Sequence, residues 1–311
     1  MSDLSLFDTW INQAGLNDLF NPRKTVTAMR DAMARMEELV EVAPPPVEEV
    51  HDIEFAGGEG PRPARIYIPY GAQPDHGPGL IFYHGGGFMV GSLKSHDPLC
   101  RRLAAVSGVR ICSVDYRLAP EHPFPAAVDD AFAAMDAALA GELAAYGFDP
   151  DRIAVGGDSA GGNLAATVAR ERRDALSYQL LLYPLMQLLQ TKKDRPRWQE
   201  GPLLSEFTLE EIRKHYIRDA DPADVRISPL LAEDLKGLPP AYILAAEMDP
   251  LLDEGAAYRD RLTASGVHVE YRLWNMVPHG FLNMSRLFPA CVTAIEASAK
   301  ALDRAFQARP L

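Results

Sequence analysis

Apolar runs and amphipathic stretches alternate along most of the chain. Short apolar runs favour buried strands, whereas apolar positions three or four residues apart favour helices. Strands are predicted at residues 50–55, 64–68, 80–83, 109–114, 152–155, 179–183, 241–246 and 267–273. Helices are predicted at residues 6–19, 24–40, 97–107, 126–139, 208–217 and 254–265, and a further helix is predicted to start near residue 162. This alternation indicates an α/β protein with a mostly parallel, doubly wound sheet of about eight strands.

Prolines and glycines mark several element boundaries. The three prolines at 44–46 end the second predicted helix, because proline removes a helical N–H group. The glycine-rich stretch at 57–61, between the first two strands, is typical of a hairpin. Asp97 is the predicted N-cap of the next helix, with Pro98 at its first position.

Two segments fall outside the alternation of strands and helices. Residues 1–43 contain helical patterns alone, and residues 188–221 are charged and helical without a strand of their own. We expect both segments to pack over the carboxyl end of the sheet. The α/β core then comprises residues 44–187 and 222–311.

The composition limits the partners and the cellular compartment. A chain of 311 residues with 47% hydrophobic residues can bury a large core. Lys and Arg number 31 and Asp and Glu 43, so the net charge of −12 argues against nucleic acid or an anionic membrane as a partner. Cys100, Cys112 and Cys291 are widely spaced and fit reduced core residues, not a disulfide framework or a metal site. We find no signal-peptide pattern and no apolar run near the ~20 residues of a membrane span, so we expect a cytoplasmic protein.

The stretch Gly157-Asp158-Ser159-Ala160-Gly161 joins a predicted strand to a predicted helix. A serine in such a turn, with glycine two positions to either side, fits a nucleophile elbow. The tight turn pushes the serine toward positive φ, and a Cβ at either glycine would clash with a neighbouring element. The first N–H groups of the new helix are aimed at the serine, where an oxyanion can be held. The alternative is a plain glycine-rich turn.

A second glycine-rich loop, His84-Gly85-Gly86-Gly87-Phe88, directly follows the strand at 80–83. Successive glycines expose backbone N–H groups. In an acyl-transfer enzyme, such a loop and the N–H group after the nucleophile form the oxyanion hole. Taken alone, the loop fits a flexible turn equally well, but an elbow further along the chain favours the oxyanion hole.

A serine nucleophile needs a base within hydrogen-bonding distance and an acid that orients the base. In the elbow fold both follow the serine, the acid first and the histidine second, each after a later strand. Asp249 follows the strand at 241–246, and His279 follows the strand at 267–273. Glu247 and Asp253 are the competing acids, although Glu247 can still lie on the strand and Asp253 in the first turn of the next helix.

Taken in order, four motifs of the chain resemble those of the hormone-sensitive-lipase-like family of α/β-hydrolase esterases, also called bacterial family IV. The motifs lie at residues 84–87, 157–162, 249–255 and 279–281, and the stretches 91–97 and 115–126 are also similar to that family. The likeness spans roughly residues 50–300. It implies an α/β-hydrolase fold with a helical cap built from the N-terminal helices and an inserted segment, here residues 1–43 and 188–221.

The resemblance also implies a role for each site residue. Ser159 is expected to be the nucleophile, His279 the base and Asp249 the acid that orients it. The expected oxyanion donors are the N–H groups of Gly86, Gly87 and Ala160, with Gly85 in a supporting position.

Five residues beside these motifs are candidates for the walls of a substrate pocket. They are Phe88, Met89, Tyr183, Leu185 and Phe281. For Tyr183 and Leu185, packing in the core is an equally good interpretation.

We therefore expect a serine carboxylesterase that acts on short-to-medium acyl esters without a metal or cofactor. The preference for shorter acyl groups comes from the resemblance, as does an expected homodimer through an edge strand or the last helix. A lactonase or an acyltransferase would use the same first steps. A non-catalytic small-molecule receptor is the alternative from another class, and the presence of His279 weighs against it.

Overall fold

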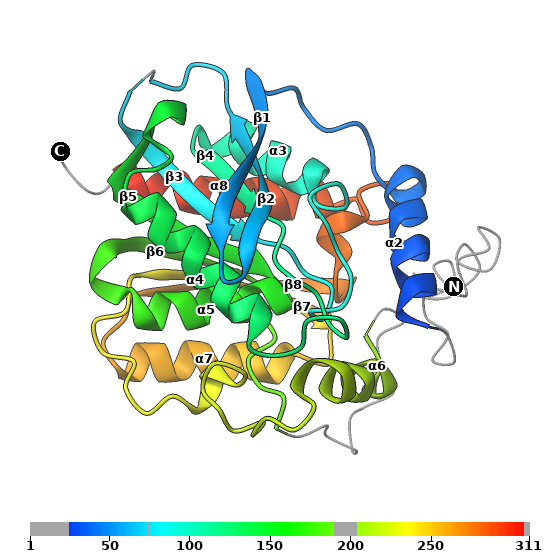
Figure 1. The fold of residues 1–311 in the computed structure, drawn as a ribbon. Helices are drawn as coiled ribbons and strands as arrows, with labels where there is room; N and C mark the ends of the chain where they lie inside the picture. The colour runs from blue at the N-terminus through cyan, green and yellow to red at the C-terminus, as the bar shows by residue number, and fades with distance from the viewer. Residues whose placement is uncertain (1–24, 74, 190–203, 308–311) are drawn as a thin grey trace.

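The computed structural model describes residues 25–73, 75–189 and 204–307. The predicted helix at 6–19 and residues 190–203 lie outside these ranges. Within them, eight strands form one sheet in the order β1-β2-β4-β3-β5-β6-β7-β8 (Figure 1). The strands are β1 Glu49–Gly57, β2 Gly60–Ile68, β3 Gly77–Tyr83, β4 Arg110–Val114, β5 Phe148–Asp158, β6 Leu176–Leu182, β7 Ala241–Met248 and β8 Val269–Pro278.

The sheet is parallel apart from its first two strands. β1 and β2 form the predicted antiparallel hairpin, and β2 also runs antiparallel to β4. All pairs from β4 to β8 are parallel. The predicted sheet class is therefore confirmed. Because parallel strands end at the same edge, the residues that follow β3, β5, β7 and β8 gather there.

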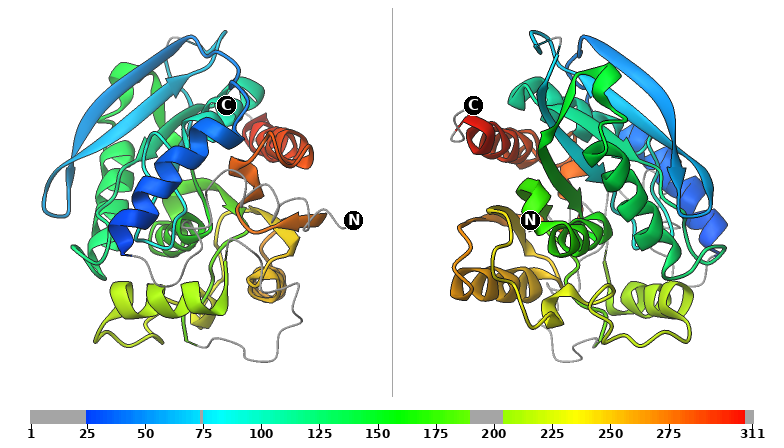
Figure 2. Two further views of the ribbon diagram at one scale, coloured as in Figure 1. Left: turned by 90° about the vertical axis from the view of Figure 1, so that its right-hand side faces the viewer. Right: turned by 60° about the vertical axis from the view of Figure 1, so that its left-hand side comes forward.

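Helices cover both faces of the sheet (Figures 1 and 2). They are α2 Val26–Val40, α3 Asp97–Ser107, α4 Ala126–Leu139, α5 Ala160–Glu171, α6 Glu206–Ile212, α7 Leu252–Ala264 and α8 Ala290–Gln307. The side chains of β3 divide between the two faces, as the two-residue period of a strand requires. Leu80 and Phe82 pack in one core with residues of α3 and α8, and Ile81 and Tyr83 pack in the other with residues of α4 and α5.

Several predicted boundaries shift by a few residues, including the ends of two helices. His96, not Asp97, is the N-cap residue of α3. Asp97 lies in the first turn, where its carboxylate accepts hydrogen bonds from Arg65, Tyr67 and Arg101. The helix predicted at 208–217 is α6, capped by the Ser205 hydroxyl oxygen, and it continues as a π-helical turn over Arg213–Ile217.

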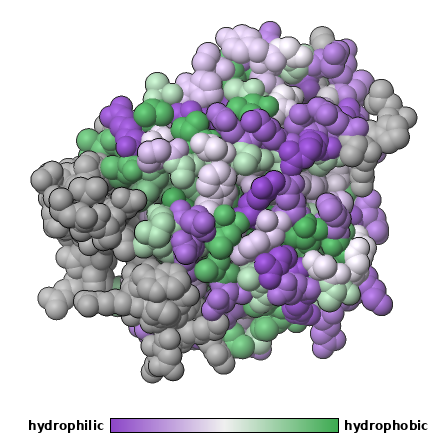
Figure 3. All heavy atoms as spheres, turned by 180° about the vertical axis from the view of Figure 1, so that it is seen from behind, coloured by the Kyte–Doolittle hydropathy of each residue, from purple (hydrophilic) through white to green (hydrophobic). Residues whose placement is uncertain are grey.

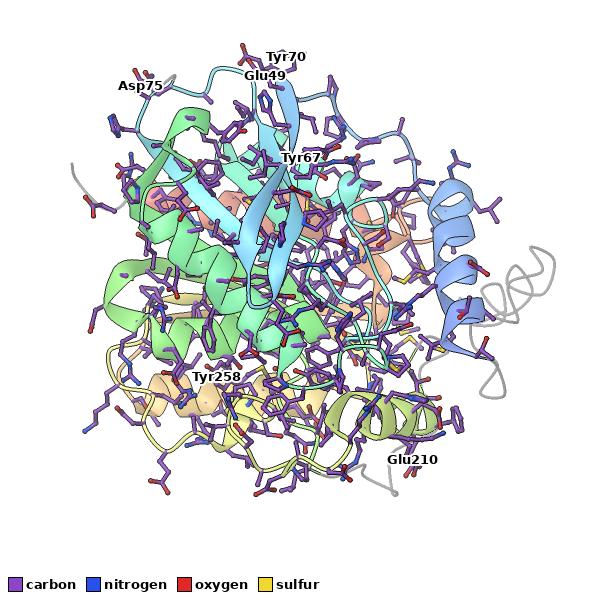
Figure 4. The ribbon with its side chains drawn as sticks, viewed as in Figure 1. Glu49, Tyr67, Tyr70, Asp75, Glu210 and Tyr258 are labelled. Atoms are coloured by element: carbon purple, nitrogen blue, oxygen red, sulfur yellow. The ribbon has the colours of Figure 1, made fainter. Side chains whose placement is uncertain are left out.

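In the described ranges, no helix is both long and apolar enough to cross a bilayer. Hydrophobic and hydrophilic residues are interspersed on the rear face (Figure 3). Exposed Tyr70 and Glu49 lie together at one end of the β1–β2 hairpin (Figure 4).

Candidate active site

Ser159 stands between the end of β5 and the start of α5. Its φ of 53° is in the left-handed region, which costs a serine about 1–3 kcal/mol. Backbone hydrogen bonds hold it there: its N–H donates to the Leu182 carbonyl (2.9 Å), and its own carbonyl accepts from the N–H groups of Asn163 (3.2 Å) and Leu185 (3.0 Å). The positive φ expected of an elbow serine is therefore present.

The glycines around Ser159 allow the close contact between β5, α5 and β3. A Cβ at Gly161 would overlap the carbonyl group of Tyr83 at the end of β3. A Cβ at Gly157 would overlap the backbone of Gly161 and the same Tyr83 oxygen. Both obstacles are backbone atoms, so no rotamer change relieves the clash. The two glycines are thus a steric requirement of this turn.

Ser159, His279 and Asp249 form a continuous hydrogen-bonded line. His279 Nε2 lies 2.8 Å from Ser159 Oγ, and His279 Nδ1 lies 2.7 Å from Asp249 Oδ2. The other Asp249 oxygen accepts the Leu251 N–H (2.8 Å). An ionised carboxylate is an acceptor alone, so Nδ1 carries the proton and Nε2 is left to accept from the serine. The imidazole is thereby oriented as a general base toward Ser159.

The competing acids lie elsewhere. Glu247 is on β7 and accepts the N–H of Met276 (2.8 Å). Asp253 lies exposed in the first turn of α7, as expected. Of the three acids, Asp249 is the one within reach of the imidazole.

The glycine loop after β3 faces the same cavity as Ser159. Gly86 and Gly87 have φ values of 118° and 61°, and a Cβ at Gly86 would overlap the carbonyl group of Val90. Gly85 differs from them, because its N–H already donates to Asp158 Oδ1 (2.8 Å). This leaves Gly86, Gly87 and the first residue of α5, Ala160, as the candidates for oxyanion donors.

A buried contact between His96 and Asp158 supports the loop from beneath. Asp158 Oδ1 lies 3.2 Å from His96 Nε2, and both side chains are almost fully buried. Burial raises the pKa of the Asp158 carboxyl, but His96 and the Gly85 N–H outweigh it, so the pKa falls below its usual value. Asp158 therefore holds the start of the glycine loop as a carboxylate. Neighbouring His84 is neutral near pH 7, since burial lowers its pKa to about 3.

A mostly apolar cavity opens above the serine. We call Gly85–Gly87, Ser159, Asp249 and His279 the floor of this site, and helices α2 and α6 its roof. The roof contributes Met29 and Met33 from α2, and Leu209 and Ile212 from α6. Further apolar lining comes from Met89, Val90, Leu185, Leu204, Leu251 and Met284, and polar lining from His96, Asp158, Thr208 and Asn283. α6 presents polar Glu210 to solvent on its outer side (Figure 4).

The five predicted wall residues separate into two groups. Met89 and Leu185 line the cavity. Phe88, Tyr183 and Phe281 are not part of its lining in the described structure. Phe88 stacks on Tyr216 of the π-helical turn (centroids 3.9 Å apart, planes at 7°), whereas Tyr183 packs against the rings of His279 (4.9 Å) and Phe281 (6.0 Å). These three aromatic residues therefore support the loops from behind.

Sequence reasoning did not single out the roof residues or the His96–Asp158 pair. Met29 and Met33 are four positions apart on one predicted helix, so their common face was detectable, but nothing indicated what that face covers. His96 precedes the serine, whereas the histidine of an elbow fold follows it, so sequence order does not indicate a place for His96 at the site. In the described parts of the chain, no cluster of three or more His, Cys, Asp or Glu side chains is arranged to hold a metal ion.

Comparisons with known proteins agree with this fold. A family model for the alpha/beta hydrolase fold matches residues 80–283. The carboxylic ester hydrolase LipN of Mycobacterium tuberculosis (strain ATCC 25618 / H37Rv) is 43% identical over 266 residues, which are 82% of this chain and 70% of LipN. An ethyl acetate hydrolase of Pseudomonas putida is 40% identical over 72% of this chain and 73% of its own length.

The solved structures extend the similarity to almost the whole chain. An ester hydrolase from the metagenome of Lake Arreo, in complex with a bipyridine phosphonate derivative, is 39% identical with a TM-score of 0.90. The match covers 98% of this chain and 97% of that one. The chain belongs to the α/β-hydrolase family, in the hormone-sensitive-lipase-like branch that its motifs indicated.

Proposed function

We propose that this chain is a serine carboxylesterase that hydrolyses short-to-medium acyl esters through an acyl-enzyme on Ser159. The observation that best supports this is the hydrogen-bonded line from Asp249 through His279 to Ser159 beneath an apolar cavity. Relatives named as carboxylic ester hydrolases and an ethyl acetate hydrolase support the substrate class.

We assign each step of the proposed reaction to a group of the site. His279 Nε2 takes the proton of Ser159 Oγ as the oxygen attacks the ester carbonyl, and Asp249 stabilises the resulting imidazolium. The N–H groups of Gly86, Gly87 and Ala160 donate to the alkoxide oxygen. When the carbonyl reforms, the alcohol leaves with the proton from Nε2. Water then attacks the acyl-enzyme, with His279 again as base, and releases the acid and free Ser159.

The proposed cap comprises residues 1–43 and 188–221, of which the structure describes α2 and α6. Both helices place apolar side chains on the cavity, and methionine adapts its shape to different chains. A cavity with this lining suits a short-to-medium alkyl group on either side of the ester bond.

A homodimer and a cytoplasmic location stay predictions. For the dimer, β8 is an edge strand of the described sheet and exposes Leu273 (46%) and Met276 (53%). Light scattering on the purified protein gives the oligomeric state directly.

The deciding experiment compares the wild-type protein with Ser159→Ala on an activated acetate or butyrate ester. We expect kcat to fall by roughly 10⁵–10⁶ without loss of fold. Ser298→Ala is the control, because Ser298 is buried in α8 and bonds within that helix. Equal release of acid and alcohol marks hydrolysis, and a new ester formed with added alcohol would mark acyl transfer. Unchanged turnover by pure Ser159→Ala would overturn the proposal.

A further inference from the structure

One end of α2 is attached through Arg30 to residues 84–90, the glycine loop and its continuation, which we call the oxyanion loop. The Arg30 guanidinium donates to the Met89 carbonyl (2.8 Å) and to the Ala119 carbonyl (2.9 Å). It also forms a two-point contact with the Glu121 carboxylate (2.9 and 2.7 Å). The Ala119 N–H in turn donates to the Phe88 carbonyl (2.8 Å). A single side chain of α2 thus fixes the segment that directly follows Gly87.

The other end of α2 is attached to residues 279–286, which begin with His279 and which we call the histidine loop. Glu41 directly follows the helix, is 9% exposed, and accepts hydrogen bonds from the hydroxyl (2.6 Å) and N–H (3.3 Å) of Ser285. The Ser285 oxygen accepts the Val42 N–H (2.8 Å), and the Arg286 N–H donates to the Val40 carbonyl (2.7 Å). These bonds join residues 40–42 to the segment that begins with His279.

Between these two attachments, α2 borders the cavity. Met29 and Met33 line it, as do Met89 from the oxyanion loop and Met284 from the histidine loop. The left view of Figure 2 shows α2 lying obliquely across this face of the molecule. Residues 84–90 and 279–286 follow different strands, β3 and β8, which are separated by β5, β6 and β7 in the sheet. Helix α2, attached to both loops, therefore spans the site from the oxyanion donors to His279.

We propose that α2 is a brace that sets the spacing between the oxyanion loop and the histidine loop, with Arg30 and Glu41 as its positioning residues. The oxyanion donors and the base act on the same reacting carbonyl, so their separation must be held to a fraction of an ångström. A roof helix attached in this way does more than cover the substrate. The inference rests on the proposed function for its kinetic readout and on the unliganded protein for a second readout.

The kinetic test is a double-mutant cycle with Arg30→Met, Glu41→Met and the double variant, measured on a short acetate ester. Each single variant removes the side-chain contacts at one end of the brace, whereas the bonds of Val40 and Val42 to the histidine loop stay in Glu41→Met. We expect kcat to fall by roughly 10-fold while KM stays within about twofold. A brace weakened at one end no longer sets the spacing. The double variant should therefore also lose roughly 10-fold, not the roughly 100-fold product of independent effects. Independent, multiplying losses would overturn the proposal, as would unchanged kcat in the single variants.

The chain provides a matched control and a milder pair of variants. Arg172 makes the same two-point contact with Asp136 (2.7 and 2.9 Å) at side-chain exposures of 32% and 51%, against 32% and 54% for Arg30 and Glu121. Arg172→Met should leave kcat unchanged; an equal loss there would show a general effect of removing such a pair. If the α2 variants do not fold, Glu121→Gln and Ser285→Ala weaken the same two attachments from the other side. Glu121→Gln removes the charge that faces Arg30 and leaves the bonds of Arg30 to the Met89 and Ala119 carbonyls, and Ser285→Ala removes the hydroxyl that bonds Glu41.

Hydrogen exchange of the unliganded protein separates this inference from the proposed function. Arg30→Met should speed amide exchange in residues 280–286 as well as in 86–90, and Glu41→Met should do the same from the other end. Faster exchange confined to the loop next to each substitution would overturn the brace, whether or not the wild-type protein hydrolyses esters. Absence of esterase activity with coupled exchange would overturn the proposed function and leave the brace standing.

Discussion

Backbone pairing in the sheet holds the floor of the site, whereas side-chain contacts hold the roof. Ser159 and Asp249 stand at the ends of β5 and β7, and the glycine loop and His279 directly follow β3 and β8. Neither α2 nor α6 continues a strand of the described sheet in this way. Each is attached through contacts such as Arg30 with Glu121, Tyr216 with Phe88, and the approach of Ile212 to Gly87.

This difference separates two tasks. Backbone hydrogen bonds between the strands position the floor with the precision that proton transfer requires, and a change in the floor should act on kcat. In the proposed reaction, the roof side chains that face the cavity contact substrate away from the reacting bond, so a change there should act on the choice of ester. Four predictions test this division.

Asp249→Asn should have the largest effect of the four. An amide at this position can donate to Nδ1 and hold the imidazole in the wrong tautomer, so we expect kcat to fall by about 10⁴. Asp253→Asn is the matched control, because Asp253 lies on the surface four residues later, in the first turn of α7. Steady-state kinetics on one acetate ester decides, and the reverse ranking of the two variants would show that the acid is misassigned.

The floor of the site could be inferred from sequence because its residues lie in short motifs next to strand ends. The helix at Ala126–Leu139 was predicted to the residue, and the order of the strands along the chain gave the order of the acid and the histidine. β5 is longer than predicted at both ends, because it also includes residues 148–151 and 156–158. Pro150, Gly156 and Gly157 in these extensions have low strand propensity. Pairing with β3 on one side and β6 on the other overrides that propensity.

The roof could not be inferred in the same way. Arg30 lies 59 residues from Met89 and 91 from Glu121 in the sequence, and no local pattern relates them. Phe88 was expected at the substrate because it adjoins the glycine loop, yet its ring stacks on Tyr216. Which way a side chain turns from a positive-φ position depends on tertiary neighbours that the sequence pattern does not specify.

Gly87→Ala tests the contact between the floor and the roof. A Cβ at Gly87 would lie 2.6 Å from Ile212 Cδ1 and 2.8 Å from its Cγ1, so the Ile212 side chain, the loop or α6 must shift. We expect kcat to fall roughly 10- to 100-fold. Adding Ile212→Ala should restore part of the loss by making room.

The control for backbone strain is Gly108→Ala. Gly108 has a φ of 68°, close to the 61° of Gly87, but no atom lies within 4 Å of its added Cβ. This variant should lose stability in thermal unfolding and keep its kcat. If Gly108→Ala lost as much kcat, or if Ile212→Ala restored nothing, the contact between α6 and the glycine loop would not explain the effect.

Met33→Ala should change substrate preference more than rate. Loss of its apolar contact should lower kcat/KM for an octanoate ester by roughly 5-fold, and kcat/KM for acetate by less than about twofold. Thr27→Ala is the control, since Thr27 is exposed on the same helix. Equal losses on both esters would mean that this roof side chain affects the chemical step itself, and the division of tasks between floor and roof would fail.

The smallest expected effect is the acid sensitivity of the roof attachment. The hydrogen bonds from Arg30 are the main cause that lowers the pKa of Glu121 from 4.5 to about 2. A lowered pKa means that the pair stabilises the fold above pH 4.5 and that this contribution is lost as the pH falls toward 2. Glu121 is 54% exposed, so the contribution should stay below about 1 kcal/mol and shrink with added salt. Urea unfolding of the wild-type protein and Glu121→Gln should therefore differ by a constant amount near neutral pH and converge below pH 4.5. A difference that grew in acid would mean that Glu121 is attached to the roof by something other than its charge.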